Sequence, residues 1–147
     1  MKAAAGTPHA NQGAATGSLA NKLGDLDASL GEFKKAMGPT WSQTVVCVAT
    51  EFGRTVRVNG TGGTDHGTAG AALLLGGAVN GGRIVTDWPG LKNSALYEGR
   101  DLAPTTDLRS VFKSVLRDHM GISNERLERD VFPGQVAVPD IADLVMN

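Results

Sequence analysis

An uninterrupted apolar run, TVVCVA (residues 44–49), constrains the fold of this chain more than any other feature. Most of its residues are β-branched and none alternates with a charged one, which is typical of a strand buried on both faces of its sheet. Such strands occur mainly in parallel sheets that helices cover on both sides. We therefore expect an α/β fold with a central, mostly parallel sheet flanked by helices.

Two apolar stripes at helical spacing predict the covering helices. The first consists of Leu19, Leu23, Leu26, Leu30, Phe33 and Met37, and Gly38-Pro39 ends it. The second consists of Leu108, Val111, Phe112, Val115, Leu116 and Met120. Thr105 or Thr106 is its expected N-cap, Asp107 falls in its first turn, and Gly121 follows its end. A shorter helix is predicted around residues 124–129.

Two further strands are predicted from AGAALLLGG (residues 69–77) and GGRIV (residues 81–85). The order helix, strand, loop, strands, helix is that of an α/β protein, in which ligands bind beyond the carboxyl ends of the strands. We expect a flexible segment at residues 1–18 and a single domain at residues 19–147, because the first 18 residues offer little to bury.

Composition excludes several classes of partner. The formal net charge of −1 provides no field for nucleic acid or for an anionic membrane. The apolar runs are far shorter than the roughly 20 residues that a membrane span needs. Cys47 is the only cysteine, which excludes an internal disulfide. No secretory signal is recognisable in these residues.

The loop EFGRTVRVNGTGGTDHG (residues 51–67) follows the apolar run and carries the residue types of a metal site. Glu51 comes directly after the first predicted strand, and Asp65 and His66 precede the next. Carboxylates and imidazoles of this kind bind divalent ions, so the sequence predicts a shared site if the strands are neighbours. Arg54 and Arg57 would bind an anionic substrate, because guanidinium groups match phosphate, sulfate or carboxylate oxygens.

Other readings of the same loop stay open at this stage. An Asp-His pair among glycines also suits a turn held by Asx hydrogen bonds, and Glu51 also suits an ion pair with Arg54. A nucleotide-binding loop is excluded, because GTGGTD lacks the last glycine of the dinucleotide pattern and no Gly-Lys-Ser/Thr follows.

The combination of EFGRT, GGTDHG, ALLLGGAVNGGRIVTDWPGL and DLAPTTDLR, with VFPG further on, resembles the C-terminal part of the bacterial family named domain of unknown function 1501. The resemblance runs from about His9 to Pro133 and implies kinship with the alkaline phosphatase and sulfatase superfamily. It implies a partial alkaline-phosphatase-like fold, with a two-metal site at the sheet edge acting on phosphate or sulfate esters.

The resemblance also implies a ligand set. His66 matches a ligand histidine that precedes a strand, and Glu51 matches an acid that closes one, with Asp65 as an additional ligand. His9, in GTPHANQG, matches the histidine of a ligand pair whose acid is replaced here by Thr7. Phe52 stands where a further ligand histidine is common. The expected metal ligands are therefore Glu51, Asp65, His66 and His9.

The resulting prediction is a metal-dependent hydrolase module that binds Zn, Mn or Ca and acts on a small anionic ester. Its nucleophile belongs to a half of the superfamily fold that these residues do not contain, so this chain by itself is expected to be impaired in turnover. The alternative is a non-catalytic assembly or anion-binding module, whose exposed sheet edge a partner chain or a second copy would cover. The resemblance suggests an exported bacterial parent protein.

Overall fold

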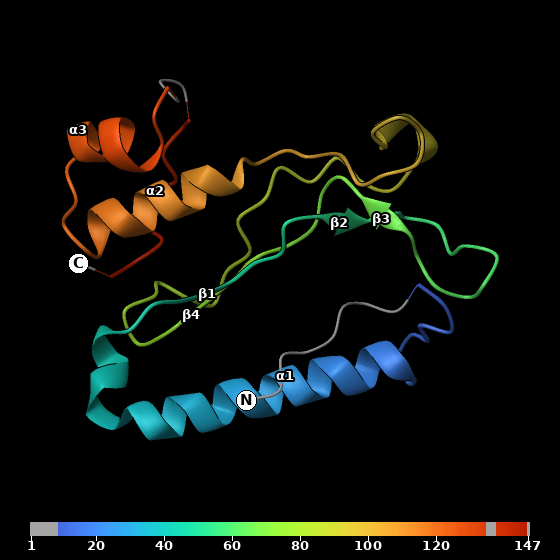
Figure 1. Cartoon of the computed structure of the whole chain (residues 1–147), viewed down its shortest axis with the longest axis horizontal. Helices are drawn as coiled ribbons and strands as arrows, with labels where there is room; N and C mark the ends of the chain where they lie inside the picture. The colour runs from blue at the N-terminus through green and yellow to red at the C-terminus, as the bar shows by residue number, and fades with distance from the viewer. Residues whose placement is uncertain (1–8, 135–137, 147) are drawn as a thin grey trace. The chain divides into compact units, whose positions relative to one another are not determined.

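A computed structural model describes residues 9–134 and 138–146 of the chain. Its contacts divide the chain into two compact units, which are described separately. Figure 1 shows the helices and strands of the chain, coloured by residue number. Unit 1 comprises residues 1–38, 50–71 and 89–104, and unit 2 comprises residues 39–49, 72–88 and 105–147. Thr7, the residue at the expected acid position, lies outside the described residues.

The predicted central parallel sheet is wrong. In unit 2, β1 (Val46–Val48) pairs antiparallel with β4 (Leu73–Leu75), and in unit 1, β2 (Gly53–Arg54) pairs antiparallel with β3 (His66–Gly67). The described residues contain two such two-stranded ribbons and no parallel pair. Three residues of the apolar run do form a strand, β1, but its ribbon is only partly covered, since Cys47 and Leu73 are exposed.

The segment GGRIV is also not a strand. Residues 81–85 have an irregular, extended path, and the side chain of Ile84 is 89% exposed. Without a central sheet there is no neighbouring strand with which this segment could pair.

The first predicted helix is confirmed as α1 (Ser18–Met37), which belongs to unit 1. Gly38, with φ of 51°, ends it, and the 3₁₀ turn η1 (Gly38–Gln43) follows. None of the residues of α1 is buried, and Leu23 and Phe33 on its apolar stripe are 55% and 44% exposed. No helix in the described part of the chain is long and apolar enough to cross a membrane.

The second predicted helix is confirmed as α2 (Leu108–Asp118) in unit 2, with a different N-cap. Asp107, not Thr105 or Thr106, caps it, because the Asp107 side chain accepts a hydrogen bond of 2.9 Å from the backbone N–H of Arg109. Gly121, with φ of 67°, follows the helix end as expected. The predicted short helix is present as α3 (Asn124–Arg126) and the π-helical turn η3 (Leu127–Val131).

Unit 2 is closed by the C-terminal residues of the chain. The backbone of Val145 bridges Val79, and the N–H of Met146 donates to the carbonyl of Ala78. The backbone N–H of Ile141 donates to the Ser114 hydroxyl on α2. This tail therefore ties α2 to the segment that follows β4.

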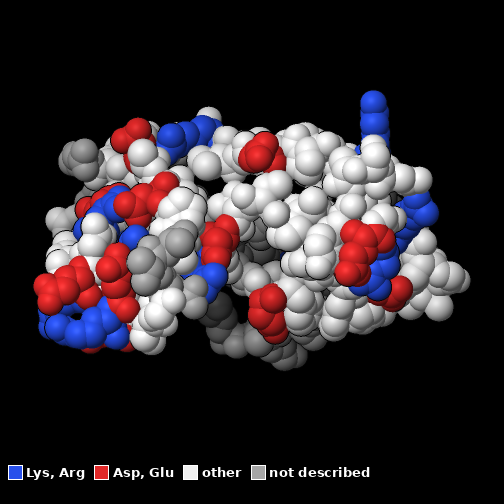
Figure 2. All heavy atoms as spheres, turned by 90° about the horizontal axis from the view of Figure 1, so that it is seen from above, with Lys and Arg blue, Asp and Glu red and all other residues white. Residues whose placement is uncertain are grey.

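Charged side chains are mixed in sign on the molecular surface. Figure 2 shows acidic and basic groups beside one another on the face that it presents, with uncharged surface between them. This distribution agrees with the near-zero net charge and provides no broad patch of one sign on that face.

Candidate functional site

The candidate site in unit 1 forms where residues 9–12 dock on the glycine-rich loop at residues 59–64. The N–H of Asn11 donates to the carbonyl of Thr61 at 2.9 Å, and the N–H of Gln12 donates to the carbonyl of Gly62 at 2.8 Å. The side-chain oxygen of Gln12 accepts from the Thr64 hydroxyl at 2.8 Å. These bonds hold the described beginning of the chain against a loop about 50 residues away in sequence.

Glycine is required at position 63 for this docking. A Cβ atom on Gly63 would lie 2.3 Å from the carbonyl oxygen of His9 and 2.7 Å from the backbone nitrogen of Ala10. Gly60 in the same loop has open space around its Cβ position. The loop thus needs Gly63 because another backbone approaches it closely.

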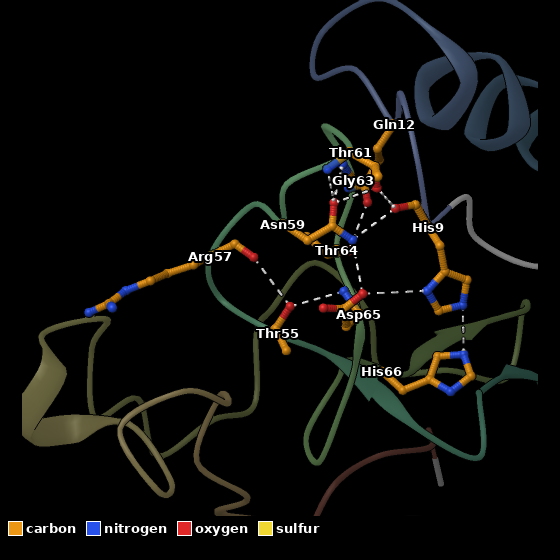
Figure 3. Close-up of polar contacts among 10 residues, drawn as sticks. All are labelled: His9, Gln12, Thr55, Arg57, Asn59, Thr61, Gly63, Thr64, Asp65 and His66. Carbon is orange, nitrogen blue, oxygen red and sulfur yellow. Dashed lines mark hydrogen bonds and ion pairs between the residues drawn. The ribbon is translucent and has the colours of Figure 1, made fainter.

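Asn59 joins the loop, the docked segment and the carboxylate of the site (Figure 3). Its Nδ2 donates to the His9 carbonyl and to Oδ1 of Asp65, each at 2.9 Å. Its Oδ1 accepts from the backbone N–H and hydroxyl of Thr61 and from the N–H of Gly63, at 2.9 to 3.1 Å. Sequence reasoning missed this residue, although an Asn in a glycine-rich loop commonly accepts a hydrogen bond from the backbone two residues on, as Asn59 does from Thr61.

The imidazoles of His9 and His66 face each other at the centre of the site (Figure 3). Their Nε2 atoms lie 3.1 Å apart, and the ring centroids are 4.6 Å apart. At that distance one imidazole donates a hydrogen bond and the other accepts it. Phe52 stacks on the His66 ring at a centroid distance of 4.0 Å, which fixes the plane of that imidazole. Phe52 therefore contacts the site through the His66 ring.

Asp65 lies on the other side of the His9 ring. Its Oδ1 is 3.8 Å from Nδ1 of His9, and the two side chains are 55% (His9) and 60% (Asp65) exposed. The distance is too long for a hydrogen bond but suits an ion pair or a small closing movement. Asp65 is thus placed to orient His9 through the nitrogen that points away from His66.

The remaining predicted site residues are Arg54, Arg57 and Glu51. Arg54 is the cross-strand partner of His66, so both side chains leave the β2–β3 ribbon on the same face, and Nε and Nη1 of Arg54 are buried. Arg57 points away from the imidazoles and its guanidinium donates to Oδ1 of Asn93 (Figure 3). Glu51 is exposed after β1, and no described contact joins it to His9 or His66.

A buried carboxylate that sequence reasoning missed supports the ribbon. Asp101 is 2% exposed, accepts a hydrogen bond of 2.9 Å from the Thr68 hydroxyl and pairs with Arg100 at 2.8 Å. Burial by itself would raise the pKa of Asp101, but the hydrogen bonds from Thr68 and Arg100 outweigh it and hold that pKa below its usual value. The backbone of Asp101 also bridges Thr55, so this charged residue anchors the strand that carries Arg54.

The described residues contain no group of three or more His, Cys, Asp or Glu side chains close enough to hold a metal ion together. Of the four predicted ligands, the structure brings together the imidazoles of His9 and His66, with the carboxylate of Asp65 beside His9.

Comparison with known proteins identifies a family for most of the chain. The model of a family described as "Protein of unknown function (DUF1501)" matches residues 8–132. No curated protein and no solved structure matches the chain. The matched range includes both histidines of the site and both strands of the ribbon that carries His66.

Proposed function

The chain belongs to the DUF1501 family of proteins of unknown function, and we propose that its unit 1 is a metal-binding module for the hydrolysis of phosphate or sulfate esters. The observation that supports this proposal is the separation of 3.1 Å between the Nε2 atoms of His9 and His66. Two nitrogens bound at about 2.0 to 2.1 Å to one tetrahedral zinc ion lie about 3.3 to 3.4 Å apart. The pair therefore needs to open by only a few tenths of an ångström to accept the ion.

The donor types favour zinc among the expected metals. Imidazole nitrogens suit zinc, whereas calcium prefers six or more oxygen ligands. Histidine ligands usually donate their other ring N–H to a carboxylate, and Asp65 stands at that place beside Nδ1 of His9. Asn59 holds Asp65 in position through its Nδ2 donor.

Each residue of the module then has a defined part. His9 and His66 hold the ion, Asp65 orients His9, and Phe52 fixes the ring plane of His66. Arg54, on the same face as His66, binds the anionic oxygens of the ester. A bound divalent ion would supply Lewis-acid polarisation of the ester and a more acidic bound water.

The three histidines of the chain provide a controlled test of metal binding. We expect about one zinc ion per chain by elemental analysis after dialysis, and loss of that ion in His9→Ala and in His66→Ala. His119→Ala is the matched control, because His119 caps the C-terminal end of α2 in the other unit and should not affect zinc content. In NMR spectra, zinc should shift the imidazole signals of two histidines and leave the third unchanged.

Hydrolysis is tested separately with chromogenic phosphate and sulfate esters in the presence of zinc. Zinc-dependent release that Arg54→Ala reduces and His119→Ala preserves would support the hydrolase proposal. A protein that retains no zinc, or whose zinc content is unchanged in both His9→Ala and His66→Ala, would contradict it.

A second candidate function is a non-catalytic anion-binding or assembly module. It is favoured by the absence of a third metal-ligand side chain at the pair among the described residues. This candidate predicts that phosphate or sulfate raises the melting temperature without zinc and that chromogenic esters stay intact. Zinc-dependent ester cleavage would exclude it.

A further inference from the structure

The two imidazoles of the pair are held by different parts of unit 1. His66 lies on β3, and the pairing of β3 with β2 and the contact with Phe52 fix its place in the ribbon. His9 lies on the docked segment, residues 9–12, which the loop at residues 59–64 holds. One imidazole is therefore built into the ribbon, and the other arrives when the segment docks.

Hydrogen bonds rather than buried apolar side chains hold the docked segment. Its residues are exposed, except for Gln12, which is half-buried. The N–H groups of Asn11 and Gln12 donate to loop carbonyls. The side chains of Asn59 and Thr61 donate to the carbonyl of His9. Exposed hydrogen bonds contribute little each, so a segment held by them opens more readily than a packed core.

The side chain of Asn59 ties the position of this segment to the orientation of its imidazole (Figure 3). Its Nδ2 donates at 2.9 Å both to the carbonyl of His9 and to Oδ1 of Asp65. The same Oδ1 of Asp65 lies 3.8 Å from Nδ1 of His9. Asn59 thus contacts the main chain of His9 directly and its ring through Asp65, from outside the set of metal ligands.

Docking and metal binding are linked in such an arrangement. An ion held by both imidazoles binds only the docked state, because the undocked segment removes His9 from His66. A ligand that prefers one of two states shifts the protein toward that state, and the effect is reciprocal. At a free ligand concentration of about 100 times its Kd, the population of the other state falls about 100-fold.

Resting on the proposed metal site, we propose that residues 9–12 form a latch that zinc closes, with Asn59 as the positioning residue that couples the latch to the site. At low free zinc the segment opens more often and takes His9 away from His66. At high free zinc it stays docked. The supply of zinc therefore regulates whether the site is assembled, and Asn59 sets the zinc affinity without contacting the ion.

Amide hydrogen exchange with and without zinc tests the latch. We expect the amides of Asn11 and Gln12 to exchange about 10 to 100 times more slowly at free zinc of about 100 times the Kd than in the metal-free protein. His66→Ala should abolish this slowing, because it removes a ligand that lies outside the docked segment. His119→Ala, in the other unit, should preserve it.

Asn59→Asp tests the coupling residue. The substitution keeps an oxygen that accepts from Thr61 and Gly63, so the turn of the loop is retained. It replaces the Nδ2 donor by a second oxygen, which would face the carbonyl of His9 and the carboxylate of Asp65. Acceptors then oppose acceptors, so docking and the orientation of the imidazole are both weakened.

Isothermal titration calorimetry with zinc measures the consequence. We expect the zinc Kd to rise about 10- to 100-fold in Asn59→Asp, as is typical when an outer partner of a metal ligand is changed. Asn21→Asp, the same change at an exposed position of α1, is the matched control and should leave the Kd unchanged. Exchange of the α1 amides should be equal in both variants, which verifies that unit 1 is folded.

The outcomes separate this inference from the proposed function. Zinc that shifts the imidazole signals of two histidines without slowing exchange in the docked segment would overturn the latch and leave the metal module intact. An unchanged zinc Kd in Asn59→Asp would overturn the coupling role of Asn59. A chain that binds no zinc would overturn both the latch and the metal module.

Discussion

Replacement of Gly63 by alanine gives a direct test of how the candidate site is assembled. The new Cβ would lie 2.3 Å from the carbonyl oxygen of His9, about 1 Å closer than a van der Waals contact allows. The atoms that it meets are backbone atoms, so no side-chain rotation relieves the clash. Residues 9–12 must therefore retreat from the loop.

The size of the effect follows from the hydrogen bonds that hold the docked segment. Four are lost on retreat: those from Asn59 and Thr61 to the His9 carbonyl, and the backbone bonds of Asn11 and Gln12. At about 0.5 to 1.5 kcal/mol each, with the low end favoured by their exposure, they contribute about 2 to 3 kcal/mol. This corresponds to about a 30- to 150-fold increase in the undocked population.

Amide hydrogen exchange measures this population directly. We expect the amides of Asn11 and Gln12 to exchange about 30 to 150 times faster in Gly63→Ala than in the wild type. Gly60→Ala is the matched control, because its Cβ meets no atom within 4 Å and exchange of both amides should be unchanged. Equal protection of both amides in wild type and Gly63→Ala would refute the docking that brings His9 to His66.

Two further predictions concern the stability of unit 2. Leu127 is fully buried, so Leu127→Ala should lower the free energy of unfolding by about 2 to 5 kcal/mol in denaturant titration. Ile84 is 89% exposed, so the control Ile84→Ala should change it by less than about 0.5 kcal/mol. Similar values for both variants would argue against this core. The hydrogen bonds from Arg109 lower the pKa of Asp107 in the folded state. The stability that this pair adds is therefore present above the pKa of an unfolded Asp, about 3.9, and is lost as the pH falls through the lower pKa of the folded state. We expect wild type to exceed Asp107→Asn by about 1 kcal/mol or less at pH 6, with the difference vanishing in acid, and a difference independent of pH would contradict the assignment.

The helices of this chain could be predicted from sequence, because each is encoded by its own residues. The stripe from Leu19 to Met37 and the stop at Gly38 define α1, and the acid at Asp107 with Gly121 brackets α2. The N-cap was misassigned by one or two residues, since Thr106 and Asp107 both have capping side chains and only the hydrogen bond to Arg109 distinguishes them.

The sheet could not be predicted in the same way, since pairing depends on residues far apart in sequence. An apolar run such as residues 44–49 is equally compatible with a central parallel strand and with a half-covered antiparallel one. Asp65 and His66 were identified as candidates from their chemistry, and His9 from the family resemblance. Their approach depends on Asn59 and Gly63, whose contacts with a segment 50 residues away leave no periodic signal in the chain.

The tail that closes unit 2 also sets an order of events during synthesis. Ala78, Leu144 and Val145 are three of the five buried apolar residues in the described part of the chain. Val145 follows Val79, the residue that its backbone bridges, by some 60 positions in the sequence. All residues of unit 1, in contrast, are translated by position 104. Unit 1, which carries His9 and His66, can therefore assemble on the ribosome before unit 2, which needs residues 144–146.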